Sequence, residues 1–122
     1  MNLTTWGTSG PWAATSFDRP YGRYAQFTSV VNDPLSIGAG EFLSFEFPMA
    51  YFLEEHGYDV TYVSNSDMLA PDRGLRCRAF VSIGHDEYWD RRQFDSVTAL
   101  RDAGVSLLFL SGNSVCWVTP LE

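Results

Sequence analysis

The spacing of apolar residues first becomes regular near residue 42. From Phe42 to Leu53, apolar side chains recur close to the helical period, which predicts a hydrophobic helix that belongs to the core. Pro48 interrupts this pattern, so either the first turns are kinked or the helix begins near Pro48, where proline suits the first turn. Gly57 follows the last apolar residues and predicts the end of the helix.

Three later segments have the composition of strands. Residues 59–64 alternate in polarity with β-branched residues, whereas residues 79–84 and 105–110 are mostly apolar. The last of these is apolar enough to predict burial on both faces. The resulting order of helix, strand, loop, strand, helix and strand predicts an α/β fold with a parallel sheet and right-handed crossovers.

A second helix is predicted between the last two strands. Asp90, followed three residues later by Gln93, resembles a capping box that begins the helix, and Gly104 ends it. One apolar stripe is expected along this helix, formed by Phe94, Val97 and Leu100.

The N-terminal third of the chain differs from the rest. Residues 1–41 are rich in glycine, proline and aromatic residues and predict a loop-rich segment. Since 122 residues fit one domain, we expect this segment to pack on an α/β core formed by residues 42–122.

Composition narrows the classes of function. The formal net charge is −7, from 15 acidic and 8 basic residues, which argues against nucleic acid or an anionic membrane as partner. No run approaches ~18 apolar residues, so no membrane span is predicted. The two cysteines, Cys77 and Cys116, match neither a zinc motif nor a disulfide framework, which favours a cytoplasmic protein.

Polar residues cluster directly after the last two predicted strands. "GHDEYW" follows one strand and "SGNSVCW" follows the other. Ligands of open parallel sheets bind beyond the carboxyl ends of the strands, and one crossover helix makes these strands neighbours. The pattern therefore predicts that His85, Glu87 and Asn113 surround one crevice.

Each of these residues also has a structural interpretation. Imidazole and carboxylate two residues apart can bind a metal or share a proton, but the acids of "HDEYW" can equally favour a helix N-terminus. Asn113 can orient a substrate carbonyl or form an Asx turn. Cys116 lacks the Gly-x-Cys-x-Gly surroundings of a nucleophile, which favours a small buried cysteine.

Four segments together resemble a known family. They are "SFDRPY" (16–21), residues 38–64, "SIGHDEYW" (82–89) and "LSGNSVCW" (110–117), and they resemble the C-terminal catalytic region of the N,N-dimethylformamidase large (beta) subunit family. The resemblance implies a class I glutamine amidotransferase-like (flavodoxin-like) three-layer domain that lacks the cysteine nucleophile of those enzymes.

The resemblance also implies an activity and a cofactor. The family hydrolyses the C–N amide bond of small N-substituted formamides such as N,N-dimethylformamide, using a mononuclear non-heme iron held by two tyrosines and one glutamate. Carried onto this chain, the glutamate is Glu87, and one tyrosine is Tyr21, with Tyr24 as the alternative.

The remaining site residues follow from the same motifs. By resemblance, His85 and Asn113 line the substrate site, where His85 transfers a proton and Asn113 donates a hydrogen bond to the developing oxyanion. Trp89 and Trp117 are expected to exclude water around the small amide substrate.

The chain departs from the family pattern in two respects. It contains no lysine, although the family places one after "SGN", and it lacks the segment that carries the second iron tyrosine. We therefore expect a fragment with an incomplete site, completed by the remainder of a larger subunit or by an oligomer partner. The alternatives are a non-catalytic α/β structural or small-molecule-binding domain, and an unrelated hydrolase that uses Cys116 with His85.

Overall fold

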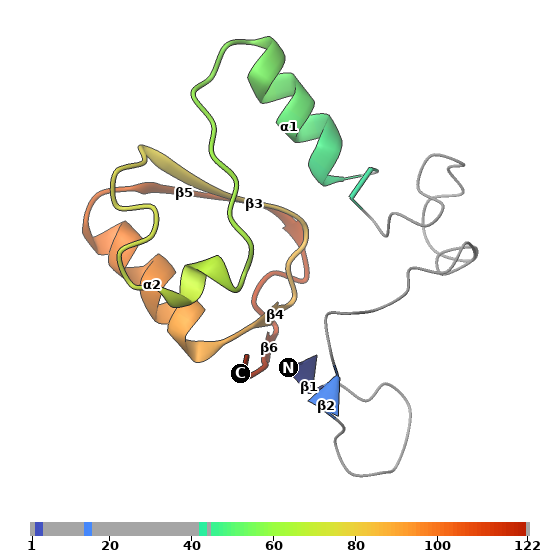
Figure 1. Cartoon of the computed structure of the whole chain (residues 1–122), viewed down its shortest axis with the longest axis vertical. Coiled ribbons are helices and arrows are strands. Elements are labelled where there is room, and N and C mark those ends of the chain that lie inside the picture. Colours follow the sequence, from blue (N-terminus) through green and yellow to red (C-terminus); the bar gives the residue numbers. More distant parts are fainter. Residues whose placement is uncertain (1, 4–13, 16–41, 44, 122) are drawn as a thin grey trace. The chain divides into compact units, whose positions relative to one another are not determined.

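The computed structural model describes residues 2–3, 14–15, 42–43 and 45–121 of the chain (Figure 1). The chain forms two compact units, one of Arg19–Tyr62 and the other of Met1–Asp18 with Val63–Glu122. Most of the segment 1–41 lies outside the described residues. The expected packing of this segment on residues 42–122 therefore stays a prediction.

Helix α1 (Glu46–Glu55) occupies the predicted position in the smaller unit. Its start at Glu46 places Pro48 in the first turn, where the missing N–H has no intrahelical partner to lose. Gly57 ends the helix in a left-handed conformation with φ of 75°. The N–H groups of Gly57 and Tyr58 donate to carbonyl oxygens of the last turn, at 3.0 Å each, which is a Schellman motif.

No residue of α1 is buried. Aromatic side chains on and next to this helix are 37–57% exposed, and they are Phe42, Phe45, Phe47, Tyr51 and Phe52. His56 caps the C-terminus, where its Nδ1 lies 2.8 Å from the carbonyl oxygen of Phe52. The position of the predicted helix is therefore confirmed, and the helix has no buried face of its own among the described residues.

The strand predicted at residues 59–64 is wrong. This segment has no regular structure, and the boundary between the two units falls within it. Alternating polarity with β-branched residues favours an extended chain. A strand forms only where a second strand supplies hydrogen bonds. Tyr62 instead donates to Glu54 Oε1 at 2.5 Å, and this bond raises the pKa of the Tyr62 phenol.

Strands β3 (Ala79–His85) and β5 (Ser106–Gly112) form the sheet of the larger unit. They are parallel, with Ala79 opposite Ser106 and His85 opposite Gly112, and α2 (Arg91–Asp102) connects them along the chain (Figure 1). The predicted α/β class with parallel strands is confirmed. The three-layer glutamine amidotransferase-like architecture stays a prediction.

The core of this unit lies between the sheet, α2 and the 3-10 helix η2 (Asp67–Leu69). Burial of each large apolar side chain contributes roughly 1.5–3 kcal/mol. The buried cluster consists of Met68, Trp89, Val97, Leu100 and Val105, with Phe80, Leu107 and Val115 packed against it.

The buried face of α2 differs by one position from the predicted stripe. Val97 and Leu100 are buried as expected, but Phe94 is 43% exposed and Gln93 is buried in its place. Residues 93, 96, 97 and 100 lie three and four apart, so they form one helix face, and Phe94 lies about 100° away from Gln93. The guanidinium of Arg91 lies 5.4 Å from the Phe94 ring centroid.

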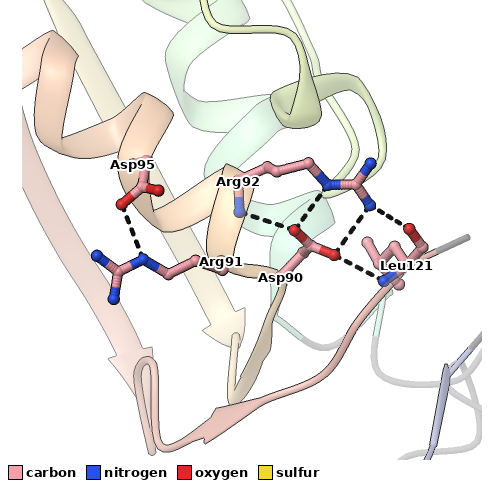
Figure 2. Close-up of polar contacts among 5 residues, drawn as sticks. All are labelled: Asp90, Arg91, Arg92, Asp95 and Leu121. Atoms are coloured by element: carbon pink, nitrogen blue, oxygen red, sulfur yellow. Dashed lines mark hydrogen bonds and ion pairs between the residues drawn. The ribbon is translucent and has the colours of Figure 1, made fainter.

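Asp90 begins α2 as its N-cap, but without a full capping box. Asp90 Oδ1 accepts from the backbone N–H of Arg92 at 2.7 Å, and Gln93 Oε1 has no hydrogen-bond partner among the described residues. The Arg92 guanidinium donates to both Asp90 carboxylate oxygens and to the Leu121 carbonyl oxygen (Figure 2). Leu121 N–H donates to Asp90 Oδ2 at 2.7 Å, so this buried carboxylate ties the helix start to residue 121.

The expectation that residues 105–110 are buried on both faces is wrong. Leu108, Phe109 and Leu110 are 40–50% exposed. Alternate residues of a strand point to opposite faces, and α2 and η2 supply the packing against Leu107 on one face only. Within the described part of the chain, the second face of the β3–β5 pair is therefore left open.

Short strand pairs complete the secondary structure. β4 (Tyr88–Trp89) pairs in parallel with β6 (Trp117–Val118), and β1 (Asn2–Leu3) pairs antiparallel with β2 (Ala14–Thr15). No helix in the described ranges is long and apolar enough to cross a membrane.

Replacing Gly104 by alanine is expected to lower the free energy of unfolding by about 1–2 kcal/mol, because a Cβ is unfavourable in left-handed backbone. Gly104 has φ of 90° at the end of α2. Urea denaturation followed by tryptophan fluorescence measures the change. Gly112→Ala is the control, since Gly112 is not left-handed and its Cβ would make an ordinary 3.5 Å contact with His85. An equal loss of unfolding free energy in Gly104→Ala and Gly112→Ala would contradict the explanation by left-handed backbone.

Candidate functional site

The two polar motifs lie side by side in the structure. His85 ends β3 opposite Gly112 at the end of β5, and pairing resumes at Tyr88 and Trp117. Between these positions, Val115 N–H donates to the Asp86 carbonyl oxygen at 3.0 Å. The prediction that "GHDEYW" and "SGNSVCW" face each other at the carboxyl edge of the sheet is confirmed for the backbone.

The second motif is the longer of the two connections. Residues 113–116 separate β5 from β6, whereas residues 86–87 separate β3 from β4. The extra length is accommodated by left-handed backbone at Asn113 (φ 49°) and Val115 (φ 57°). Asparagine tolerates this conformation, but for a β-branched residue such as valine it costs roughly 1–2 kcal/mol. Strained backbone of this kind is concentrated at functional sites, which directs attention to this loop.

His85 and Glu87 form an ion-pair-type contact, with Nε2 3.4 Å from Oε2. The imidazole side chain is 45% exposed, whereas the Glu87 side chain is only 12% exposed. The indole N–H of Trp117 donates to Glu87 Oε1 at 3.1 Å. The carboxylate is therefore held from two sides, and the imidazole beside it stays accessible to a small molecule.

Asn113 follows Gly112, so the strand register places it one residue beyond the partner of His85. Asn113 is exposed. A Cβ built on Gly112 would lie 3.5 Å from His85 Nδ1, which shows how closely the backbone of β5 approaches the imidazole. The backbone thus brings His85, Glu87 and Asn113 to one edge of the sheet.

Asp86 lies between the two predicted site residues, and its contacts were not foreseen. Its Oδ2 accepts from Ser82 Oγ at 2.7 Å, and its Oδ1 accepts from Asn65 Nδ2 at 3.1 Å. Its backbone N–H donates to Ser111 Oγ at 3.0 Å. The available signal was Ser82, a polar residue within an otherwise apolar strand.

A comparison with protein families shows to which family the chain belongs. The model of a family described as "N,N-dimethylformamidase beta subunit-like, C-terminal" matches residues 4–122. The chain belongs to this family. The searches of curated proteins and of solved structures gave no match.

The two tryptophans of this N,N-dimethylformamidase-like chain that were expected to border the site differ in position. Trp89 does not line the site, because it is 2% exposed and packs in the core against Phe80 and Phe109. Trp117 is 60% exposed and borders Glu87 through its indole N–H. The sequence could not separate these roles, since both tryptophans follow a strand end.

The expectation that Cys116 is buried is wrong. Cys116 is exposed and Cys77 is half-buried, and both are free thiols. Because Cys116 is accessible, it serves as a control position for activity measurements.

The family resemblance of the sequence predicts an iron site, for which the described residues supply only part of the ligands expected. No group of three or more His, Cys, Asp or Glu side chains in that part of the chain is placed to hold a metal ion. Tyr21, the expected phenolate ligand, lies outside the described residues. Glu87 fits one position of an oxygen ligand set, since a carboxylate has about four lone-pair sites and the contacts with Trp117 and His85 leave some of them available.

Proposed function

We propose that this chain takes part in hydrolysis of the C–N amide bond of small N-substituted formamides, such as N,N-dimethylformamide. Family membership supports this reaction class. The observation that carries the proposal is the contact between His85 and Glu87 at the strand position that pairs with Gly112, next to Asn113. These groups together offer a proton carrier, a carboxylate and an amide donor to one small substrate.

His85 transfers the proton in this proposal. Its imidazole is accessible, and imidazole changes protonation state near neutral pH, as a general acid or base must. Glu87 Oε2 lies 3.4 Å from His85 Nε2 and orients the ring. Amide hydrolysis requires such a proton at the departing amine nitrogen.

Asn113 binds the substrate carbonyl oxygen in this proposal. A side-chain amide donor gains strength as negative charge develops on that oxygen, and removal of one such donor typically costs about 2.7–4 kcal/mol of transition-state stabilisation. The left-handed backbone at Asn113 holds this residue at the turn that leaves β5.

The proposal includes a mononuclear non-heme iron held by Glu87 and Tyr21. Phenolate and carboxylate are hard oxygen donors that suit ferric iron. When bound, iron supplies Lewis-acid polarisation of the amide oxygen and a lower pKa of bound water. The beta subunit-like description of the family supports a larger assembly, in which other chain segments complete the ligand set.

Replacing Glu87 by glutamine is expected to weaken iron binding at least tenfold, because the amide removes the anionic oxygen ligand. Purified protein is reconstituted with ferric iron, and bound metal and tyrosinate charge-transfer absorption are measured. Asp95→Asn is the matched control, since Asp95 is an exposed acid on α2 that pairs with Arg91.

The same preparations are assayed for release of dimethylamine from N,N-dimethylformamide. Hydrolysis by the wild-type protein, lost in Glu87→Gln and kept in Asp95→Asn, supports the proposal. Wild-type protein that binds no iron and hydrolyses no formamide would contradict the proposal for this chain. Unchanged iron affinity in Glu87→Gln would remove Glu87 from the ligand set.

A further inference from the structure

Asp86 has hydrogen-bond partners in four separate parts of the larger unit. Its carboxylate accepts from Ser82 Oγ in β3 and from Asn65 Nδ2 in the segment before η2. Its backbone N–H donates to Ser111 Oγ in β5, and its carbonyl oxygen accepts from the N–H of Val115. Both backbone groups and both carboxylate oxygens of this one residue are therefore engaged.

The side chain of Asp86 serves the fold without occupying the site. His85 and Glu87 are two residues apart and contact each other, which places their side chains on one side of the chain. The Asp86 carboxylate is bonded instead to Ser82, which is 3% exposed, and to Asn65. Asp86 thus anchors the two-residue connection 86–87 from the side opposite to the proposed chemistry.

The same residue also reaches the second motif. Ser111 Oγ accepts from the Asp86 N–H and donates to the carbonyl oxygen of Gly112 at 3.1 Å. Gly112 is the register partner of His85 and precedes Asn113. The hydrogen bonds of Asp86 therefore link the two strand ends that carry the proposed site residues.

We propose that Asp86 is a positioning residue that holds Glu87 against the Trp117 indole and the His85 imidazole. This inference rests on the proposed function for its catalytic meaning, but the geometry it describes belongs to the protein without metal or substrate. Asp86 acts through its neighbours and does not itself contact the reacting atoms.

The Trp117 indole N–H provides a direct readout of this geometry. Trp117 is 60% exposed, so the bond to Glu87 Oε1 is its protection from solvent exchange in the described structure. Trp89 is 2% exposed in the core, and its indole N–H reports whether the fold is intact. Both signals are observed in 15N-labelled protein by NMR, and Trp117→Phe assigns the first.

Asp86→Ala is expected to raise the solvent-exchange rate of the Trp117 indole N–H about tenfold, with the Trp89 signal unchanged. Asp86→Asn is expected to keep the wild-type rate. Its amide oxygen can accept from Asn65, and its N–H can donate to Ser82, whose hydroxyl both donates and accepts. Gly104→Ala is the control for general destabilisation and is expected to leave the Trp117 rate unchanged.

An unchanged Trp117 rate in Asp86→Ala would overturn the inference, and so would an equal rise in Gly104→Ala. If Asp86→Ala loses the Trp89 signal, Ser82→Ala and Asn65→Ala remove one anchor each. Each of these two variants is expected to raise the Trp117 exchange rate by less than removal of the whole Asp86 carboxylate would. No rise in either variant would also overturn the inference.

The formamide assay separates this inference from the proposed function. Asp86→Ala is expected to lower kcat with little change in KM, and Asp86→Asn is expected to recover kcat. If the exchange rates behave as expected and the wild-type protein hydrolyses no formamide, the positioning role stands and the proposed function fails. If the wild-type protein hydrolyses formamide and the exchange rates do not change in the Asp86 variants, the proposed function stands and the positioning role fails.

Discussion

Replacement of Asp90 by alanine is expected to lower the free energy of unfolding by about 3 kcal/mol, the combined effect of a lost N-cap and of donors left without an acceptor. Asp90 is 4% exposed and accepts four hydrogen bonds, three from Arg92 and one from Leu121 N–H. Urea denaturation followed by Trp89 fluorescence measures the loss, since Trp89 lies in the core of the same unit.

The neighbouring pair of Arg91 and Asp95 provides the control for this variant. Their side chains are 73% and 57% exposed at a separation of 3.0 Å, and Figure 2 shows them beside the Asp90 cluster. An exposed pair of this spacing contributes only about 0.3–0.5 kcal/mol. Asp95→Ala should therefore have a small effect, and a loss equal to that of Asp90→Ala would show that charge on α2, rather than the buried cluster, determines stability.

The contribution of Asp90 depends on pH. Its side-chain bonds from Arg92, together with the N–H groups of Leu121 and Arg92, hold the pKa of the Asp90 carboxyl well below the ordinary 3.8, although burial acts in the opposite direction. A depressed carboxyl pKa in the folded state stabilises the protein above the unfolded value and loses this effect as the pH falls below it. The stability difference between wild type and Asp90→Asn should thus be full at pH 6 and shrink as the pH falls below about 4.

Replacement of His85 by alanine is expected to reduce kcat for formamide hydrolysis by roughly 10²- to 10⁴-fold, the usual contribution of general acid–base catalysis. Under the proposed function, the accessible imidazole beside Glu87 delivers the proton that the departing amine needs. Steady-state assays with N,N-dimethylformamide measure the loss, which should fall on kcat more than on KM.

The second histidine makes a matched control. His56 caps α1, where its ring contacts Phe52 and its Nδ1 bonds a carbonyl oxygen, so His56→Ala should keep its activity. Cys116→Ser should also keep it, because the proposal uses no thiol. Activity that survives in His85→Ala and disappears in Cys116→Ser would replace the proposed mechanism with a cysteine nucleophile.

The strand ends were predictable from the sequence because local and global patterns agree there. The apolar run 79–84 ends in Gly84, and the run 105–110 is followed by Ser111 and Gly112. A well-marked helix lies between the two runs, and this order specifies parallel neighbours. Residues 59–64 carry an equally clear local pattern without a partner strand among the described residues. A strand forms only when a second segment pairs with it, and the sequence of the strand itself does not specify which segment that is.

The side-chain contacts of the site were less predictable. The pairing of His85 with Glu87 follows from their spacing of two along extended backbone. The bond from Trp117 to Glu87 depends on the length of the loop 113–116, and the hydrogen-bond partners of Asp86 extend to Val115, far along the sequence. Such contacts require the fold first, and Ser82 within its apolar strand is the sequence signal that pointed to a polar partner.

The exposed strand β5, whose second face is open within the described part of the chain, also affects association with other chains. β5 reads "SLLFLSG", seven residues without a charge or a proline, and its described pairing is with β3 alone. Segments of this composition, when exposed, template pairing with other chains and lead to aggregation. The strand that places Gly112 opposite His85 is thus also a segment on which an assembled neighbour would suppress pairing with other chains.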